Sequence, residues 1–267
     1  MQKTALVAVD LDGTLLTSQG SLAPRSAAAL QRAAGQGVHV VLATTRNPDS
    51  VLPIYRTLGL ADPLICTNGA QVWGSPTGPV WAHHVIPLEA ALAIAGQADA
   101  HGWELSTTVG SITYWRQRPG QALGPIAPHL TVVPTNADAV VGEPVRFLAH
   151  QPAAITQLHA LCQARFAQQC RTELFYKADG SRHSLGIFAP QGNKGAALAL
   201  VCDRLGVERE NVMAIGDNLN DLPMFPYASL RVAMGNGVEQ LKREATAIAP
   251  SNDDEGVAWA LEQYVLI

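Results

Sequence analysis

Short apolar runs rich in β-branched residues recur at both ends of this chain, and polar side chains follow four of them. This feature constrains the fold most, because a strand that is apolar on both faces must be covered on both faces. Stretches typical of helices separate the runs. The predicted elements of the first part are strands at 4–9, 38–43 and 64–67, with helices at 24–36 and 48–58. Such alternation predicts an α/β fold with a doubly wound, largely parallel sheet.

The same alternation returns in the last third of the chain. It predicts a helix at 194–205, strands at 211–215 and 230–233, a short helix after Asp217 and a final helix at 254–264. Both ends of the chain therefore belong to one three-layer core with a Rossmann-like sheet.

The middle of the chain has a different pattern. It predicts helices at 88–100 and 152–169, and strands at 104–109, 112–117, 145–149, 172–177 and 184–188. Gly110 and Ser111 form a tight hairpin signal between two of these strands. Hairpins mixed with helices indicate an antiparallel α+β unit. We therefore expect residues 83–184 to form a second domain, inserted into a core made of residues 1–82 and 185–267.

Composition narrows the partners and the compartment. The 267 residues carry a net charge of −4, with 48% hydrophobic and 15% charged side chains, and no basic cluster is interleaved with aromatic residues. We therefore expect no nucleic-acid partner. No apolar run approaches the roughly 18 residues that would span a bilayer, so we expect no membrane partner. No signal-peptide pattern is seen and the four cysteines form no CxxC pair, which favours a cytoplasmic protein.

Polar side chains gather where the core strands end. The residues concerned are Asp10 and Asp12 after the first strand, Thr44 and Arg46 after the second, Asn68 after the third, and Asp217, Asn220 and Asp221 after strand 211–215. In an open parallel sheet, ligands bind outside the carboxyl ends of the strands. The sequence therefore predicts a functional site at this edge.

Several carboxylates in one cleft repel one another unless a cation is present. Ligation by oxygen alone, without His or Cys, suits Mg²⁺. An ionised Asp10 could then act as a nucleophile toward phosphorus. Asp12, two residues on, could protonate the leaving oxygen and later deprotonate water.

A phosphoryl group at this edge needs positive charge around it. Lys194 is the candidate, since it stands in the first turn of a predicted helix, where the helix dipole also favours an anion. Thr44 and the backbone around Thr45 could donate hydrogen bonds from another side. Taken singly, each of these signals also fits ordinary turn, N-cap or surface chemistry; their common order at strand ends favours a phosphoryl-transfer site.

The same residues resemble the haloacid dehalogenase-like hydrolase superfamily. The resemblance rests on four segments in order, namely Asp10 to Leu15, Thr44, Lys194, and Gly216 to Asp221. Two further segments, Thr67 to Ala70 and Asn252 to Val257, together with the insertion between Thr44 and Lys194, are similar to the Cof-type subfamily with its type IIB α+β cap.

This resemblance implies a Mg²⁺-dependent phosphatase, a phosphoric monoester hydrolase acting on a small phosphorylated metabolite such as a sugar phosphate through an aspartyl-phosphate. It implies that the inserted domain governs substrate specificity. The implied roles are Asp10 as nucleophile and metal ligand, Asp12 as acid/base and backbone-carbonyl metal ligand, Asp217 as metal ligand, Asp221 as a supporting or direct metal residue, and Leu11 (backbone), Thr44, Thr45, Lys194 and Asn220 as phosphate contacts.

One position departs from the family pattern, since Thr45 stands where Gly is common. The backbone N–H is retained, and the extra side chain narrows the expected site. Two other functions remain open at this point. One is a phosphosugar mutase on the same fold, and the other is a catalytically silent regulator that binds a phosphorylated ligand. We expect a monomer or a homodimer.

Overall fold

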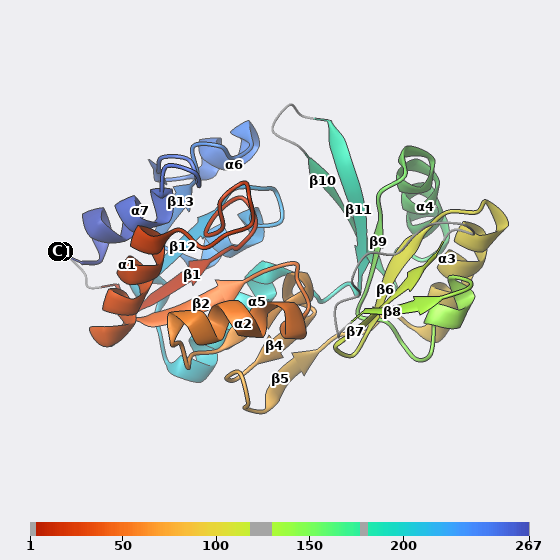
Figure 1. Cartoon of the computed structure of the whole chain (residues 1–267), viewed down its shortest axis with the longest axis horizontal. Coiled ribbons are helices and arrows are strands. Elements are labelled where there is room, and N and C mark those ends of the chain that lie inside the picture. The colour runs from red at the N-terminus through yellow and green to blue at the C-terminus, as the bar shows by residue number, and fades with distance from the viewer. Residues whose placement is uncertain (1–3, 118–129, 177–180, 267) are drawn as a thin grey trace. The chain divides into compact units, whose positions relative to one another are not determined.

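The computed structural model describes residues 4–117, 130–176 and 181–266. Its internal contacts divide the chain into two compact units (Figure 1). The first contains the chain up to Arg46, residues Val51–Ala82 and the chain from Asn193 onward, and the second contains Asn47–Ser50 and His83–Gly192. The second boundary thus follows Gly192 rather than residue 184, because the strand Arg182–Phe188 pairs with strands of the second unit.

The first unit is built on a sheet with the strand order β14-β13-β12-β1-β2-β3-β4-β5. Its strands are β1 (Leu6–Val9), β2 (His39–Ala43), β3 (Leu64–Cys66), β4 (Gln71–Trp73), β5 (Val80–His83), β12 (Val212–Gly216), β13 (Leu230–Ala233) and β14 (Ala247–Ile248). The pairings from β14 through β3 are parallel, whereas β4 runs antiparallel to β3. The predicted α/β class with a largely parallel sheet is confirmed.

Helices cover both faces of this sheet. They are α1 (Pro24–Gly35), α2 (Pro48–Leu58), α5 (Lys194–Leu205), α6 (Glu239–Glu244) and α7 (Gly256–Tyr264), with short 3₁₀ helices η1 (Thr67–Gly69), η3 (Arg209–Asn211) and η4 (Leu222–Tyr227). Figure 1 shows α1 and α7 side by side, and the two helices pack on each other. The short helix predicted after Asp217 is the 3₁₀ helix η4.

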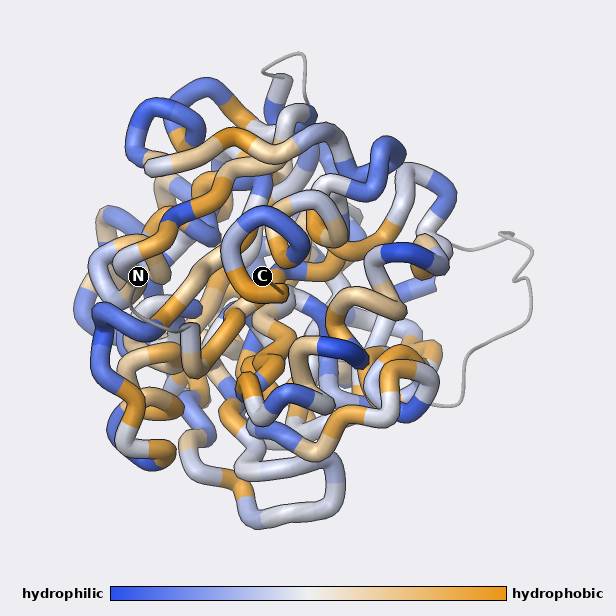
Figure 2. Tube along the Cα trace, turned by 90° about the vertical axis from the view of Figure 1, so that its left-hand side faces the viewer, coloured by the Kyte–Doolittle hydropathy of each residue, from blue (hydrophilic) through white to orange (hydrophobic). Residues whose placement is uncertain are grey.

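The central strand shows why two layers of helices are needed. Val7 and Val9 pack into the core that includes Leu30 of α1, whereas Leu6 and Ala8 pack into the core that includes Leu198 of α5. All four strand residues are fully buried. Figure 2 shows hydrophobic stretches of the trace through the middle of the view and hydrophilic stretches mostly toward its outside. Burial of apolar surface on both faces therefore holds β1, and the residue that follows it, in place.

The second unit has a six-stranded sheet with the order β10-β11-β9-β6-β7-β8. Its elements are β6 (Leu105–Val109), β7 (Ile112–Arg116), β8 (Leu130–Val133), β9 (Arg146–Ala149), β10 (Arg171–Tyr176), β11 (Arg182–Phe188), α3 (Leu88–Ala100), α4 (Pro152–Arg165) and η2 (Ala137–Ala139). The pairings are antiparallel except for β7 with β8. Both helices lie on the same side of this sheet (Figure 1) and share its hydrophobic core.

Helix α4 ends at Arg165, before the predicted end at residue 169. Phe166 leaves the helical conformation with φ of −129°, and its side chain is buried in the core of the unit. Packing of this ring thus overrides the helical pattern of the following residues.

The strand predicted at 172–177 ends at Lys177, which lies outside the described residues. Within the described parts of the chain, no helix is long and apolar enough to cross a bilayer.

Candidate active site

The parallel register brings four strand ends together. Val9 of β1 pairs with Ile215 of β12 and with Leu42 of β2, so the residues after these strands lie at one edge. The backbone N–H of Asp10 donates to the carbonyl of Ile215 at 3.1 Å. Farther along the edge, the Thr44 N–H donates to Ile65 and the Asn68 N–H donates to Thr44. The strand ends thus fix the starting points of the predicted site residues other than Lys194, which begins a helix.

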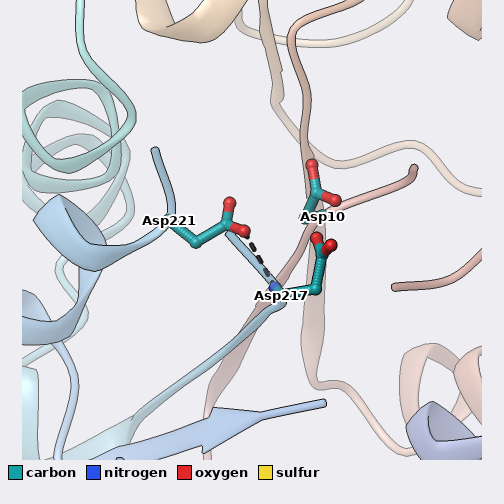
Figure 3. A group of neighbouring side chains, drawn as sticks. All are labelled: Asp10, Asp217 and Asp221. Carbon is teal, nitrogen blue, oxygen red and sulfur yellow. Dashed lines mark hydrogen bonds between the residues drawn. The ribbon is translucent and has the colours of Figure 1, made fainter. Parts of the chain in front are cut away.

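Three aspartates form the centre of this edge (Figure 3). Asp10, Asp217 and Asp221 each offer a carboxylate oxygen, and these oxygens lie within 4.8 Å of one another. Asp221 is fully buried, and its Oδ2 accepts the backbone N–H groups of Asp217 and Asn218, both at 3.0 Å. The loop after β12 is therefore folded around the Asp221 carboxylate.

Lys194 places a positive charge beside two of the carboxylates. Its Nζ donates to Oδ1 of Asp10 and to Oδ1 of Asp221, at 2.6 Å each, and its side chain is fully buried. The residue begins α5, whose N-cap Asn193 accepts the N–H of Ala196 through its side chain. The cap fixes the first helical turn and hence the direction of the lysine side chain.

Burial controls the charge states of these groups. It raises the pKa of Asp10 from 3.8 to about 7, aided by the charge of Asp221 and opposed by Lys194. Burial, together with the charges of Asp10 and Asp221, raises the pKa of Asp217 well above its ordinary value. Burial opposes the charge of Lys194, but the neighbouring carboxylates outweigh it and raise the pKa of the ammonium. One lysine therefore does not neutralise the site by itself.

The site fits a hard divalent cation. The three carboxylates supply only oxygen ligands, which Mg²⁺ prefers. Burial, the main cause of the raised pKa of Asp10 and of Asp217, disfavours their ionised forms, which a bound cation would favour. Both oxygens of Asp221 already have hydrogen-bond partners, so Asp10 and Asp217 are the carboxylates best able to bind an ion directly.

The Asp12 carboxylate is not part of this group of three. Its oxygens accept two hydrogen bonds from the Arg46 guanidinium, from Nε at 2.9 Å and from Nη2 at 2.6 Å. Hydrogen bonding to Asp12 raises the pKa of Arg46 above its ordinary value. Asp12 therefore forms a two-point ion pair with Arg46, to which the sequence assigned no role.

The remaining predicted residues surround the aspartates. Leu11 has a fully buried side chain, and its carbonyl accepts the N–H groups of Thr14 and Leu16. Thr44 is fully buried and Asn220 nearly so. The Asn220 Nδ2 donates to Oδ1 of Asn68 at 3.4 Å. Thr45 follows Thr44 in the same loop and is partly exposed.

Residues to which the sequence analysis assigned no individual role hold the loop after β1. The Thr14 hydroxyl donates to Oδ1 of Asp217 at 3.2 Å, and Asn236 Nδ2 donates to the Gly13 carbonyl at 2.8 Å. Asn252 Nδ2 donates to the Leu16 carbonyl at 2.8 Å, and the Asn252 N–H donates to Oδ1 of Asn236 at 3.0 Å. In the sequence, the available signal for Asn252 was its place at the start of one of the two segments that are similar to the Cof-type subfamily.

These features define an α/β protein with a site of carboxylates and a lysine at the edge of its sheet, and comparison with known proteins gives its family. A model described as haloacid dehalogenase-like hydrolase matches residues 7–261. The chain belongs to this family and is of the Cof type, as the resemblance predicted.

Curated relatives match over nearly the whole chain. The chain is 30% identical over 263 residues to the 5-amino-6-(5-phospho-D-ribitylamino)uracil phosphatase YcsE of Bacillus subtilis, covering 98% of this chain and 96% of the relative. It is 27% identical over 270 residues to the pyridoxal phosphate phosphatase YbhA of Escherichia coli, with 98% and 99% covered.

A solved structure gives the same fold. The subclass IIB sugar phosphatase BT4131 superposes with a TM-score of 0.82 at 20% identity, covering 99% of this chain and 100% of that one. Together, family and relatives identify a phosphatase, a phosphoric monoester hydrolase, as predicted.

Proposed function

We propose that this phosphatase requires Mg²⁺ and hydrolyses a small phosphorylated metabolite through an aspartyl-phosphate on Asp10. The observation that carries the proposal is the joint position of Asp10, Asp217, Asp221 and Lys194. Their charged groups meet at the carboxyl ends of the strands, with Lys194 Nζ hydrogen-bonded to both Asp10 and Asp221. In this proposal Asp10, Asp217 and the Asp12 backbone carbonyl hold the ion, and Asp221 supports Lys194 and the loop after β12.

In the first step a carboxylate oxygen of Asp10 attacks phosphorus. A bond forms between that oxygen and phosphorus, the bond from phosphorus to the leaving oxygen breaks, and Asp12 gives the leaving oxygen a proton. Bound Mg²⁺ would supply the positive charge that keeps Asp10 ionised and offsets the charge on the phosphoryl oxygens. Lys194 adds a second, fixed positive charge.

In the second step Asp12 takes a proton from water. The hydroxide oxygen attacks phosphorus, the bond to Asp10 breaks, and inorganic phosphate leaves. Phosphate is held by Lys194 with Thr44, Thr45, Asn220 and the backbone N–H of Leu11. Two carboxylates two residues apart can thus serve both halves of the reaction.

The substrate proposal is a small metabolite phosphate, such as a sugar phosphate. Relatives named for a phosphoribitylamino-uracil, for pyridoxal phosphate and for a sugar support this class. The inner site offers groups suited to phosphate and a cation. We therefore assign the choice of leaving group to the second unit, as the specificity cap.

Hydrolysis of p-nitrophenyl phosphate with Mg²⁺ and with EDTA tests the proposal, followed by a panel of sugar, pyridoxal and flavin phosphates. We expect turnover that EDTA abolishes. Asp10→Asn should abolish turnover and leave phosphate binding largely intact, whereas Asp203→Asn, at an exposed position of α5, should leave both unchanged. Activity of Asp10→Asn close to that of the unmodified protein would overturn the covalent mechanism.

The same experiment addresses the two open alternatives. A mutase would return phosphate to the sugar and release little inorganic phosphate. A silent regulator would bind phosphate without any turnover. Release of stoichiometric inorganic phosphate from a panel substrate would exclude both.

A further inference from the structure

We propose that Arg46 is a positioning residue that orients the Asp12 carboxylate for both proton transfers. This inference rests on the proposed function, because it assumes that Asp12 is the acid and base. It assigns to Arg46 an action through Asp12 rather than a contact with substrate.

The first support is the geometry of the pair. Nε of Arg46 donates to Oδ2 of Asp12 and Nη2 donates to Oδ1, so each carboxylate oxygen has its own donor. A planar guanidinium matched to a carboxylate in this way fixes both the place and the plane of the carboxylate. A lysine ammonium at this place would fix its distance from the carboxylate but not the plane of the carboxylate.

The second support is the anchoring of Arg46 itself. Its N–H donates to the Thr44 hydroxyl at 3.1 Å, and its carbonyl accepts the N–H of Thr67 at 2.8 Å. Thr44 is fully buried at the end of β2. The backbone of Arg46 is therefore fixed on both sides by residues of the sheet edge.

Ordinary surface ion pairs are weak because both side chains are free to move. The Arg46 and Asp12 side chains are 32% and 49% exposed, so this pair is not expected to add much to stability. The backbone anchors of Arg46, and the position of Asp12 two residues from Asp10, instead favour a role in orienting the Asp12 carboxylate. Acid–base catalysis depends on such orientation, because a proton is transferred only within hydrogen-bond reach.

The pair leaves Asp12 free to exchange a proton. Each carboxylate oxygen has two lone pairs, and each accepts one hydrogen bond from Arg46. The second lone pair of either oxygen can then exchange a proton with the leaving group or with water. Arg46 therefore keeps Asp12 in one orientation through both transfers.

Kinetics on two substrates distinguishes this positioning role from a substrate contact and from a purely structural role. The p-nitrophenolate leaving group needs no proton, so Asp12 is required only in the second step, hydrolysis of the aspartyl-phosphate. An alkyl phosphate such as glycerol 3-phosphate, or the best alkyl substrate of the panel, needs Asp12 in both steps. Because kcat/KM reports on steps up to the first irreversible one, the two substrates should respond differently.

For Arg46→Ala we expect kcat on p-nitrophenyl phosphate to fall at least about tenfold, which is part of the roughly 10²–10⁴-fold that acid–base catalysis contributes. KM should fall with it, so that kcat/KM stays within about threefold. Phosphoenzyme trapped by acid quench should rise. On the alkyl phosphate, both kcat and kcat/KM should fall, because Asp12 is needed in both steps.

Two variants serve as controls. Arg25 makes a similar two-point contact with Glu262 in the same unit, so Arg25→Ala should leave all these quantities unchanged. Arg46→Lys keeps the charge but not the two-point geometry, and should recover only part of the rate. Added guanidinium should partly rescue Arg46→Ala.

Other outcomes overturn the inference. A rise in KM on both substrates with kcat unchanged would make Arg46 a substrate contact. An equal fall in kcat on both, without extra phosphoenzyme, would indicate loss of structure. Absence of turnover by the unmodified protein would instead overturn the proposed function, and the role of Arg46 with it.

Discussion

Lys194 Nζ lies 2.6 Å from Oδ1 of Asp10, although 184 residues separate them in sequence. One residue follows β1 and the other begins α5, so the contact depends on the folding of the whole first unit. Lys194 is fully buried and has a second carboxylate partner in Asp221. The charged centre of the site is therefore also part of the interior of the protein.

Removing the lysine should destabilise the metal-free protein. Lys194→Met leaves two buried carboxylates without their shared cation, and breaking a buried pair in this way costs about 3–5 kcal/mol. Unfolding by urea at pH 8 in EDTA measures the loss. Lys242→Met removes an ion pair with the exposed Glu239 and should change the free energy of unfolding by no more than about 1 kcal/mol. Equal stability of the two variants would contradict the prediction.

The pKa of Asp10 predicts how pH affects the binding of Mg²⁺. In the metal-free folded protein this pKa is raised to about 7 from 3.8, so between these values the folded chain holds a proton that the unfolded chain has lost. The contribution of Asp10 to stability therefore falls as pH rises from about 4 to about 7 and is then constant. Because Mg²⁺ must displace this proton, it should raise the Tm more at pH 8 than at pH 5.5.

Thermal unfolding with Mg²⁺ or EDTA, at steps of pH between those two values, measures this effect. Asp10→Asn retains Asp217, whose pKa is also raised, so this variant measures the part of the pH dependence that does not come from Asp10. A Mg²⁺-induced rise in Tm that is the same at both pH values would contradict the prediction.

Two glycines provide a matched test of the loop after β1. Gly13 and Gly20 both have positive φ, of 84° and 74°, so Ala costs similar backbone strain at each. A Cβ at Gly13 would lie 2.5 Å from Oδ2 of Asp217, whereas a Cβ at Gly20 would meet nothing within 4 Å. Gly13→Ala should therefore weaken Mg²⁺ binding, and Gly20→Ala should lower stability alone. Isothermal titration with Mg²⁺ distinguishes them, and equal affinities would contradict the prediction.

The sequence predicted the parts of the site that depend on strand ends. Asp10 and Asp217 follow buried strands, and neighbouring parallel strands end at one edge, so their proximity follows from the pattern of apolar runs. The place of Lys194 at this site was predictable because the residue stands in the first turn of a helix. Each of these inferences needs only the direction of the backbone and the order of the elements.

The pairing of long side chains could not be predicted in this way. Arg46 was seen to follow β2, but its contact with Asp12 depends on the path of the loops after β1 and β2. Asn252 likewise reaches the Leu16 carbonyl from a segment more than two hundred residues away in sequence. Such contacts depend on loop conformation and side-chain rotamers, for which a periodic pattern carries no signal. The early end of α4 at Arg165 has a similar cause, since tertiary packing of Phe166 decides it.

The hydrogen bonds of Asp221 predict that a substitution of this residue weakens the binding of Mg²⁺ less than a substitution of Asp217 does. Oδ1 of Asp221 is bound to Lys194 and Oδ2 to two backbone N–H groups. Asn at 221 must place its amide nitrogen toward one of these donors, which misplaces Lys194 or the loop. Loss of such a supporting group typically weakens metal binding about 10–100-fold. We therefore expect Asp221→Asn to weaken Mg²⁺ binding within that range and Asp217→Asn, which removes a charged ligand, to abolish it at millimolar Mg²⁺. Calorimetric titration of both variants measures the difference, and complete loss in both would make Asp221 a direct ligand.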